Sequence, residues 1–421
     1  MPAPVVMRIV VVGTGYVGLA CVGFTEWGHH VIGVDIDAEK IALLNCGEMP
    51  IAEPGLSDLV AKGMSSGLLT FTTDLVEVMK GADVCFVCVG TPSLPGGSVD
   101  LQYIESAVAS VKKYIESTTA LVIKSTVPVG TCARLGAASN PEFLREGRAV
   151  QDFLHPDRVV IGSSDEQTTK KLLELYASAD APRLTMSTAS SELTKYAANG
   201  FLATKISFIN EIAAIAEKVG ADIRDVTKAL GLDPRIGPHF LRAGIGYGGS
   251  CFPKDTEALM KIADLHEMDF EILRAASVAN DRARQRFVDK VLASVGANPK
   301  LAVWGLAFKA QTDDVRKSAA IDVIELLLAK GAVITAYDPL AVDNARRILG
   351  DRVSYAASAN DAIQGVEALL ILTEWPEFRE IFIKKNPLSF SDGLKIFDGR
   401  NLLADLDFPN LVGVGGGRWI A

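Results

Sequence analysis

One of the six cysteines stands in surroundings that suit a nucleophile. Cys251 lies in the glycine-rich run 244–255, whereas Cys21 lies in an apolar stretch. A thiol becomes a nucleophile where a nearby cation or helix dipole favours the thiolate, and Lys254 and Lys195 are candidates for that cation. We therefore expect Cys251 to carry covalent chemistry; the alternative is an inert small residue in a turn.

Two pairs of polar residues have spacings that suit proton transfer. Lys195 and Asn199 stand four residues apart in a predicted helix and share one face, so they could polarise or deprotonate one substrate oxygen. Taken alone, the same pair could equally face solvent. Glu142 and Glu146 flank an Asn-Pro-Glu turn, where one carboxylate can act as a base on water while the other orients a sugar.

Isolated cations in turn-like segments are candidates for phosphate recognition. Surface charge is the alternative for each of them. They are Arg235, Lys309, Arg316 and Arg400.

The first segment that must position this chemistry is a strand, a glycine turn and a helix. A buried strand over 7–12 runs into Gly13-Thr-Gly15-Tyr-Val-Gly18, and a helix is predicted from Leu19 to Trp27. Gly13 makes the tight turn, Gly15 lets a pyrophosphate approach the backbone, and Gly18 allows close packing of helix on strand. The helix N-terminus then faces the phosphate. The pattern predicts a dinucleotide site.

An acidic residue selects between the two nicotinamide dinucleotides. Asp35 ends the next predicted strand, Val31 to Val34, about twenty residues after the first glycine. A carboxylate there accepts from the ribose hydroxyl and repels a 2′-phosphate, which favours NAD over NADP. Lys40 lies close by and could soften that preference.

Further strands are predicted over 83–89 and 120–124, and each ends in a polar turn. Ligands of open parallel sheets lie outside the carboxyl ends of the strands, so Thr91, Ser125 and Thr126 should line the cofactor cleft. Cys85 and Cys88 form a CxxC within the first of these strands. Because side chains alternate along a strand, the two should point to opposite faces and serve packing rather than metal binding.

A long helix and a second α/β segment follow. The helix is predicted over about 190–219, roughly 45 Å, which is long enough to link two domains. After more helix over about 256–293, the pattern strand, turn, helix, strand returns over 301–338 and ends at Asp338. It lacks the second and third glycines, so we expect a mononucleotide there rather than a second dinucleotide, or no ligand at all.

Composition bounds the function class. The chain has 421 residues, of which 49% are hydrophobic and 22% charged, and its net charge of −9 argues against nucleic acid as a partner. Six scattered cysteines are too few for a disulfide framework and are expected as reduced thiols in a cytoplasmic protein. No signal peptide or run of about 18 apolar residues is visible, so no membrane partner is expected.

Together the motifs resemble the UDP-glucose/GDP-mannose dehydrogenase family over nearly the whole chain. Beyond the first glycine turn, the resemblance rests on Ser125-Thr-Val-Pro-Val-Gly130, Asn140-Pro-Glu-Phe-Leu-Arg-Glu-Gly147, Asp152-Phe-Leu-His-Pro-Asp-Arg158, Glu192-Leu-Thr-Lys-Tyr-Ala-Ala-Asn199, Gly246-Tyr-Gly-Gly-Ser-Cys-Phe-Pro-Lys-Asp255, Gly305-Leu-Ala-Phe-Lys309 and Asp398-Gly-Arg400.

The resemblance implies an α/β fold of two Rossmann-like doubly wound domains joined by a long central helix. It divides the chain into an NAD-binding domain over 1–185, a central helical dimerisation and active-site domain over 186–296, and a UDP-sugar-binding domain over 297–421. It also implies a four-electron oxidation of a nucleotide-sugar C6 alcohol to a carboxylate, with two NAD⁺. The run 152–158 is more similar to the UDP-glucose branch, so UDP-glucuronate is the expected product, for polysaccharide biosynthesis.

The resemblance also implies residue roles. Lys195, Asn199 and Asp255, with a water near Thr126, would surround the C6 oxygen and take its proton. Cys251 would then form a thiohemiacetal and, after the second oxidation, a thioester. Water activated by Glu142 or Asp255 would hydrolyse it.

The residues expected to bind NAD are Gly13, Gly15, Tyr16, Val17, Gly18, Asp35, Lys40, Gly90, Thr91, Ser125, Thr126, Glu146, Lys254 and Arg316. Those expected to bind UDP-glucose are Glu142, Phe143, Leu144, Arg145, Glu146, Lys195, Asn199, Arg235, Phe240, Leu241, Arg242, Ala243, Gly244, Gly248, Phe308, Lys309 and Arg400. No metal is expected. Arg235 would reach across from a neighbouring subunit, which implies a homodimer or a higher homo-oligomer.

One segment departs from the family. Only eight residues, 132–139, stand between Thr131 and Asn140, where family members carry a crossover helix and strand with on the order of twenty more residues. Either a βα unit has been lost, which would put Thr126 and Glu142 out of place, or a stretch is missing from the sequence. We expect the second, and a break in the structure near 131–140 would support it.

Other functions remain open from the sequence. GDP-mannose, UDP-N-acetylmannosamine or UDP-N-acetylglucosamine could replace UDP-glucose in the same chemistry. A two-electron dehydrogenase of hydroxy acids would use Lys195 and Asn199 but would not need Cys251. A third reading is an NAD-sensing protein with a decayed site.

Overall fold

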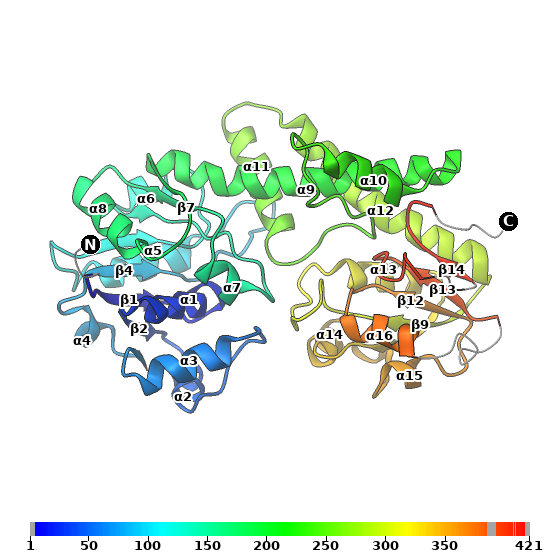
Figure 1. The fold of residues 1–421 in the computed structure, drawn as a ribbon, viewed down its shortest axis with the longest axis horizontal. Coiled ribbons are helices and arrows are strands. Elements are labelled where there is room, and N and C mark those ends of the chain that lie inside the picture. The colour runs from blue at the N-terminus through cyan, green and yellow to red at the C-terminus, as the bar shows by residue number, and fades with distance from the viewer. Residues whose placement is uncertain (1–4, 385–392, 407, 409, 417–421) are drawn as a thin grey trace. The chain divides into compact units, whose positions relative to one another are not determined.

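The computed structural model describes residues 5–384, 393–406, 408 and 410–416. It divides into two compact units, the first formed by 1–198 with 257–266 and the second by 199–256 with 267–421. Each unit contains a parallel sheet with helices on both faces, as Figure 1 shows in blue to cyan for the first and in yellow to red for the second. The predicted fold class is confirmed.

The sheet of the first unit has eight strands in the order β3-β2-β1-β4-β5-β6-β7-β8. All neighbours are parallel except β6 and β7. Because the order reverses between β1 and β4, a crevice is expected at the carboxyl ends of these two strands. The strands are β1 (Arg8–Val12), β2 (His30–Val34), β3 (Leu69–Thr72), β4 (Val84–Val87), β5 (Ala120–Ile123), β6 (Ala138–Ser139), β7 (Val159–Gly162) and β8 (Arg183–Met186).

Apolar strands are covered on both faces by helices. One core contains side chains of α1, η1, α3, α7 and α8, and the other contains side chains of α4, α5 and α6. Cys88 belongs to the first core and Cys85 to the second, so the two cysteines face opposite sides of the sheet as predicted. The helices are α1 (Tyr16–Ala20), η1 (Cys21–Trp27), α2 (Ala38–Asn45), α3 (Leu56–Ser65), α4 (Leu75–Met79), α5 (Gln102–Val111), α6 (Thr131–Arg134), α7 (Ala149–Leu154) and α8 (Glu166–Leu175).

The first helix differs from its prediction. It begins at Tyr16 rather than Leu19, directly after the glycine turn, and from Cys21 to Trp27 it tightens to a 3₁₀ helix. At Gly23 a Cβ would lie 2.4 Å from the Phe153 ring, so the segment is pressed against α7. The helix therefore starts about one turn earlier than the apolar pattern indicates.

The shortened crossover is continuous. Between β5 and β6 the chain forms the one-turn helix α6, and Asn140 N donates to Ile123 O at 3.0 Å, so the two strands pair in parallel. The fourteen residues that separate the strands meet the minimum of about a dozen that a parallel crossover needs. The chain is continuous through residues 131–140, and the expectation that a stretch is missing there stays a prediction.

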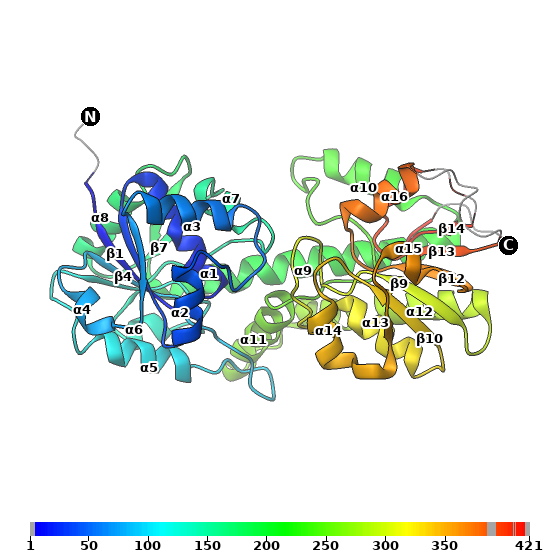
Figure 2. The same ribbon diagram turned by 90° about the horizontal axis from the view of Figure 1, so that it is seen from below.

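The second unit has a smaller sheet in the order β11-β10-β9-β12-β13-β14, all parallel. The helix α12 packs beside α13 on one face (Figure 2). The strands are β9 (Lys300–Trp304), β10 (Val333–Tyr337), β11 (Ser354–Tyr355), β12 (Ala368–Ile371), β13 (Lys395–Asp398) and β14 (Leu411–Val412). The helices between them are α13 (Ala319–Leu328), α14 (Val342–Leu349), η2 (Gly350–Arg352), α15 (Ala359–Ala362) and α16 (Pro376–Lys384).

The predicted long helix is α9 (Thr188–Val219), with 32 residues. The chain passes from one compact unit to the other within it. Three helices follow, α10 (Ile223–Leu232), α11 (Phe252–Leu265) and α12 (Glu271–Val295), so the single helical stretch expected over 256–293 is divided in two.

A buried carboxylate holds the shortened crossover, which gives a first prediction. Glu192 of α9 accepts from the backbone amides of Gly130 at 2.6 Å and Cys132 at 2.7 Å. Glu192→Ala leaves both amides without this acceptor and should lower the free energy of unfolding by about 2–4 kcal/mol. In urea denaturation the control Glu105→Ala, which removes the exposed Arg134 pair of the same crossover, should cost less than about 1 kcal/mol. Equal losses would contradict this account.

Candidate functional site

The glycine turn has the geometry of a dinucleotide site. Gly13 has φ +97°, and a Cβ there would lie 2.9 Å from the Cys88 carbonyl oxygen. A Cβ at Gly18 would lie 1.8 Å from the Gly13 oxygen. At Gly15 no protein atom lies within 4 Å of a Cβ position, which leaves room for a pyrophosphate. Two glycines are thus required by packing, and the third faces open space, as a bound dinucleotide needs.

Asp35 is placed and charged as a ribose acceptor must be. Its Oδ2 accepts from the backbone nitrogen of Thr14 at 2.9 Å, the Thr14 hydroxyl at 2.7 Å and Lys40 Nζ at 3.0 Å. Burial works to raise the pKa of Asp35, but these bonds and the amide of Asp37 lower it to about 2. The sequence analysis did not single out Thr14. Its hydroxyl side chain, which stands between two glycines of the turn, was the signal that could have identified it.

Three polar residues lie where β4 and β5 end. Ser125 is buried and its hydroxyl donates to Val89 O at 2.6 Å, which ties the two turns together. Thr91 and Thr126 are half-buried, and Gly90 is exposed. All belong to the edge of the sheet that carries the glycine turn, as the strand pattern predicted.

A buried ion pair joins the Asn-Pro-Glu turn to α9. Lys195 Nζ lies 2.9 Å from Glu142 Oε1, and their side chains are only 4% and 6% exposed. Leu144 N donates to the other carboxylate oxygen at 2.6 Å. Burial works to raise the pKa of Glu142, but Lys195 and the Leu144 amide help to hold it below its ordinary value. Glu142 is therefore fixed as a carboxylate, despite the shortened crossover before it.

Aromatic and charged residues surround this pair. Phe143 is half-buried, with Lys195 Nζ 5.4 Å and the Arg158 guanidinium carbon 3.8 Å from its ring centre. Arg145 is exposed and is held by Asp152 through two side-chain bonds of 2.8 and 2.6 Å. Tyr16, Val17, Leu144 and Glu146 are half-buried in the same unit.

The second unit carries the predicted nucleophile beside a buried amide–carboxylate pair. Cys251 is half-buried and directly precedes α11, and its carbonyl accepts from Asp255 N at 2.8 Å. Asn199 Nδ2 donates to Asp255 Oδ2 at 2.6 Å, and Lys254 Nζ donates to Oδ1 at 2.7 Å. Asp255 is 1% exposed. The structure thus brings together Asn199 and Asp255, which were expected at the same substrate oxygen, and adds Lys254, which was expected to bind NAD.

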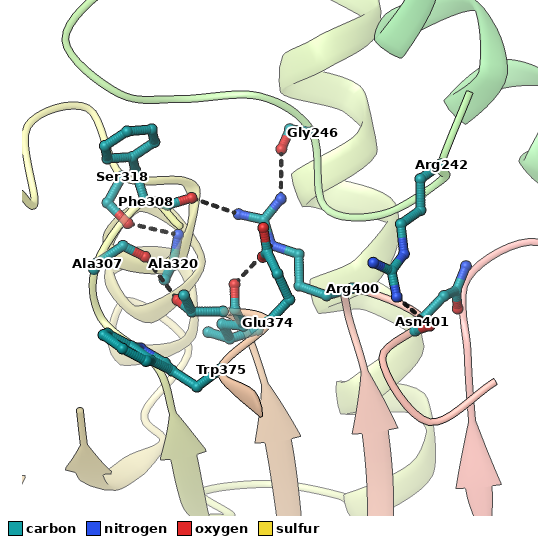
Figure 3. Close-up of polar contacts among 12 residues, drawn as sticks. Arg242, Gly246, Ala307, Phe308, Ser318, Ala320, Glu374, Trp375, Arg400 and Asn401 are labelled. Carbon is teal, nitrogen blue, oxygen red and sulfur yellow. Dashed lines mark hydrogen bonds and ion pairs between the residues drawn. The ribbon is translucent and has the colours of Figure 1, made fainter. Parts of the chain in front are cut away.

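Arg400 joins the loop before Cys251 to the carboxyl ends of the second sheet. Figure 3 shows its guanidinium between two backbone carbonyls, those of Gly246 at 3.1 Å and Phe308 at 3.3 Å. Its Nε donates to Leu372 O at 2.8 Å and lies 3.6 Å from a carboxylate oxygen of Glu374. This guanidinium therefore fixes loops directly, and any phosphate contact would share it with these carbonyls.

Glycines allow the loop to approach the second sheet closely. A Cβ at Gly244 would lie 2.7 Å from Gly399 O, and one at Gly248 would lie 2.2 Å from Lys317 O. Phe240 has a positive φ of 63°, Leu241 and Ala243 are buried, and Arg242 donates to Asn401 O at 2.9 Å. The loop 240–248 is held by backbone contacts.

Two predicted cations are exposed. Arg235 and Arg316 have side chains 87% and 68% exposed, each in a bidentate bond with a nearby aspartate, Asp233 and Asp314. Lys309 is half-buried, with Nζ 5.6 Å from the centre of the Phe308 ring.

The second Asp at a strand end differs from the first. Asp338 is 2% exposed, and its Oδ2 accepts from Leu306 N, Ala307 N and Trp375 Nε1 at 2.7–3.2 Å. Its other oxygen accepts from Leu340 N and Ala341 N at 2.9 Å. Five donors, four backbone amides and one indole, thus occupy both oxygens of the buried Asp338, which fits a structural role.

Within the described part of the chain, no group of three or more His, Cys, Asp or Glu side chains could hold a metal ion. Among the same residues, no helix is both long and apolar enough to cross a bilayer.

The chain matches three family models along its length. They are the NAD binding, central and UDP binding domains of the UDP-glucose/GDP-mannose dehydrogenase family, at residues 7–180, 189–282 and 302–405. UDP-glucose 6-dehydrogenase YwqF of Bacillus subtilis is 45% identical over 416 residues, with 94% of this chain and 93% of that relative covered. UDP-glucose 6-dehydrogenase of Rhizobium meliloti is 44% identical over 398 residues, with 89% and 91% covered.

A solved structure is similar over almost the entire chain. A UDP-glucose dehydrogenase from the hyperthermophilic archaeon Pyrobaculum islandicum aligns with a TM-score of 0.91 and 38% identity, covering 99% of both chains.

The contrast between two glycines gives a second prediction. Gly15→Ala meets no protein atom, so it should leave thermal unfolding unchanged and weaken NAD⁺ binding tenfold or more, by about 1.4 kcal/mol or more, through contact with the pyrophosphate. Gly18→Ala clashes with the Gly13 carbonyl and should lower the melting temperature as well. Calorimetric titration and thermal denaturation measure the two effects. Unchanged NAD⁺ affinity in Gly15→Ala would contradict the assignment.

Proposed function

Because this chain belongs to the UDP-glucose/GDP-mannose dehydrogenase family, we propose that it oxidises UDP-glucose to UDP-glucuronate with two NAD⁺ per sugar. The family and the cofactor NAD were both expected from the motifs, and both are confirmed. The observation that carries the proposal is the half-buried thiol of Cys251, four residues before a buried carboxylate that Asn199 and Lys254 both contact.

The first oxidation needs a group that takes the alcohol proton. NAD⁺ is the hydride acceptor in both oxidations. Lys195, Asn199 and Asp255 are the groups that we assign to the C6 oxygen, with a water near Thr126. The Asn199–Asp255 bond holds the amide, so its remaining proton and its oxygen have a fixed direction.

Covalent capture follows. The Cys251 sulfur bonds to the C6 carbon of the aldehyde, and the carbonyl oxygen takes up a proton to give a thiohemiacetal. The second oxidation removes hydride from C6 and the proton from this hydroxyl, which leaves a thioester. Glu142 takes a proton from water, the water oxygen bonds to the carbonyl carbon, and the C–S bond breaks to return the thiolate. The balance is alcohol, two NAD⁺ and water giving carboxylate, two NADH and three protons.

Binding roles follow the same family pattern. We assign NAD to Gly13, Gly15, Tyr16, Val17, Gly18, Asp35, Lys40, Gly90, Thr91, Ser125, Thr126, Glu146, Lys254 and Arg316. We assign UDP-glucose to 142–146, Lys195, Asn199, Arg235, 240–244, Gly248, Phe308, Lys309 and Arg400. The division 1–185, 186–296 and 297–421 stays a proposal, as does a cytoplasmic location, where Cys251 would stay reduced.

Stoichiometry and one thiol give the third prediction. The wild-type chain should form two NADH per UDP-glucose, and the product should be UDP-glucuronate. Cys251→Ala should form less than about a thousandth of the acid, since no covalent capture is possible, while its circular dichroism and NAD⁺ affinity stay those of the wild type.

The matched control is Cys46→Ala, which removes an exposed thiol and should retain full activity. Full acid formation in Cys251→Ala would contradict the covalent route. Turnover of GDP-mannose or a UDP-N-acetylhexosamine, with none of UDP-glucose, would contradict the substrate.

We also propose that the protein works as a homodimer through α9. Phe201, Phe208, Ile215 and Val219 are spaced by seven, seven and four residues on this helix and are 54–70% exposed. Such spacing places them on one face, and an exposed apolar stripe of this kind favours burial against a second copy. The exposed Arg235 would then be available to the neighbouring subunit.

A charge in the stripe gives the fourth prediction. Phe208→Glu should convert a dimer of twice 44.8 kDa into a monomer in light scattering, because a carboxylate would be buried in the interface. The control Lys228→Glu, an exposed residue of α10, should remain dimeric. A monomeric wild-type protein that is fully active at the same concentration would contradict the proposal.

A further inference from the structure

A lysine that is not among the assigned site residues lies buried at the end of β5. Lys124 is 4% exposed and directly precedes Ser125 and Thr126 of the cofactor turn. Its Nζ donates to Asn140 Oδ1 at 2.9 Å and to the Tyr176 hydroxyl at 3.2 Å. Both of these partners are neutral. A buried ammonium costs several kcal/mol unless a charge compensates it. Burial of Lys124 beside these two partners alone is therefore unfavourable.

Asn140 connects this lysine to the candidate base. The Tyr176 hydroxyl donates to Asn140 Oδ1 at 2.6 Å, and Asn140 Nδ2 donates to Val160 O at 2.8 Å. The amide is therefore fixed by three partners, which lie directly after β5, in β7 and at the end of α8. Glu142 follows two residues later, so the position of its backbone depends on this anchor.

The anchor lies across the shortened crossover. Lys124 is the first residue after β5, and Asn140 the first after β6. A side-chain bond between them fixes the separation of the two strand ends directly. With only the one-turn helix α6 in between, this bond and the bonds to Glu192 hold the two ends of the crossover.

Charged groups from several elements face Glu142. Lys195 of α9 pairs with it, Arg158 lies just before β7, and Lys124 lies after β5. Burial raises the pKa of Glu142, yet Lys195, the Leu144 amide and Lys124 together bring it below its ordinary value. Two buried lysines thus face one buried carboxylate.

Titratable groups also face Lys124 itself. They are Tyr176 at the end of α8, Cys21 at the start of η1 and Cys88 after β4. Burial works to lower the pKa of Lys124, but these groups raise it above its ordinary value, so the side chain stays charged at neutral pH.

A small cavity lies among these groups. Its volume is about 50 Å³, and Lys124, Asn140, Glu142, Phe143, Arg158 and Tyr176 are among its lining residues. That space is large enough for one water molecule, and the polar lining offers hydrogen bonds to it. A water here would lie beside the Glu142 carboxylate.

We propose that Lys124 is a positioning residue that holds the Asn140–Glu142 turn and keeps Glu142 a carboxylate, ready to take the proton of the water that hydrolyses the Cys251 thioester. The inference rests on the proposed function. In this step the water proton moves to Glu142, the water oxygen bonds to the thioester carbon, and the sulfur leaves as thiolate.

The test removes the charge while keeping the shape. Lys124→Met and Lys124→Gln are close in size, and Tyr176 still donates to Asn140 in both. Loss of a nearby cation raises a carboxyl pKa, so the titration midpoint of Glu142 should move up by about one pH unit or more. Difference infrared spectra against Glu142→Gln measure this midpoint without turnover.

Turnover gives the second readout. In single-turnover experiments, the acid-side midpoint of the rate of acid formation after the second NADH should move to higher pH in step with the carboxyl. The KM for UDP-glucose should change less than about twofold, since Lys124 is not assigned to sugar binding. Tyr176→Phe removes a bond to the same Asn140 oxygen but no charge, so its midpoint should stay that of the wild type.

Three outcomes overturn or separate the claims. If Lys124→Met and Lys124→Gln fold and the titration midpoint of Glu142 does not move, the proposal is overturned. If both variants fail to fold, the proposal is also overturned, because Lys124 would then be only a core residue. A wild-type protein that forms no NADH from UDP-glucose contradicts the proposed function instead, while the infrared midpoint still decides the role of Lys124.

Discussion

The buried ion pair between Glu142 and Lys195 is the interaction on which the first unit's chemistry depends. It fixes the turn after a shortened crossover to the long helix, with Nζ and Oε1 2.9 Å apart and both side chains almost fully buried. Breaking one side of such a pair leaves an uncompensated buried charge, which costs about 3–5 kcal/mol. The same constraint that holds the fold therefore keeps a buried carboxylate ionised beside an ammonium, as the proposed proton transfer requires.

The second unit uses a different device, in which backbone carbonyls and small residues fix a loop. Arg400 bonds to the carbonyls of Gly246, Phe308 and Leu372, so one guanidinium sets the loop that leads to Cys251 (Figure 3). Asp255 then accepts from Asn199 and Lys254, which gives α11 a fixed start directly after the thiol. The groups assigned to catalysis in each unit are thus held by charge-assisted bonds rather than by apolar packing alone.

Much of this arrangement was readable from the sequence because its motifs are local. The glycine turn, Asp35 and the long helix each depend on residues close together in the chain, where spacing translates directly into geometry. The bonds of Lys124 to Asn140 and of Glu192 to Gly130 were missed, because they join residues 16 and 62 positions apart. Strands as short as β6 and β11, with two residues each, also gave no periodic signal. Arg400 was predicted to bind phosphate, and its bonds to three backbone carbonyls depend on loop geometry that no spacing encodes.

Mass spectrometry of the acid-quenched protein tests the central claim most directly. After mixing with UDP-glucose and excess NAD⁺, a fraction of the wild-type chain should gain the mass of a UDP-glucuronyl group, and the gain should map to the peptide that contains Cys251. The adduct should accumulate when Glu142 is replaced by glutamine, because hydrolysis is slowed. An unmodified Cys251 under conditions in which two NADH are formed per sugar would contradict the account.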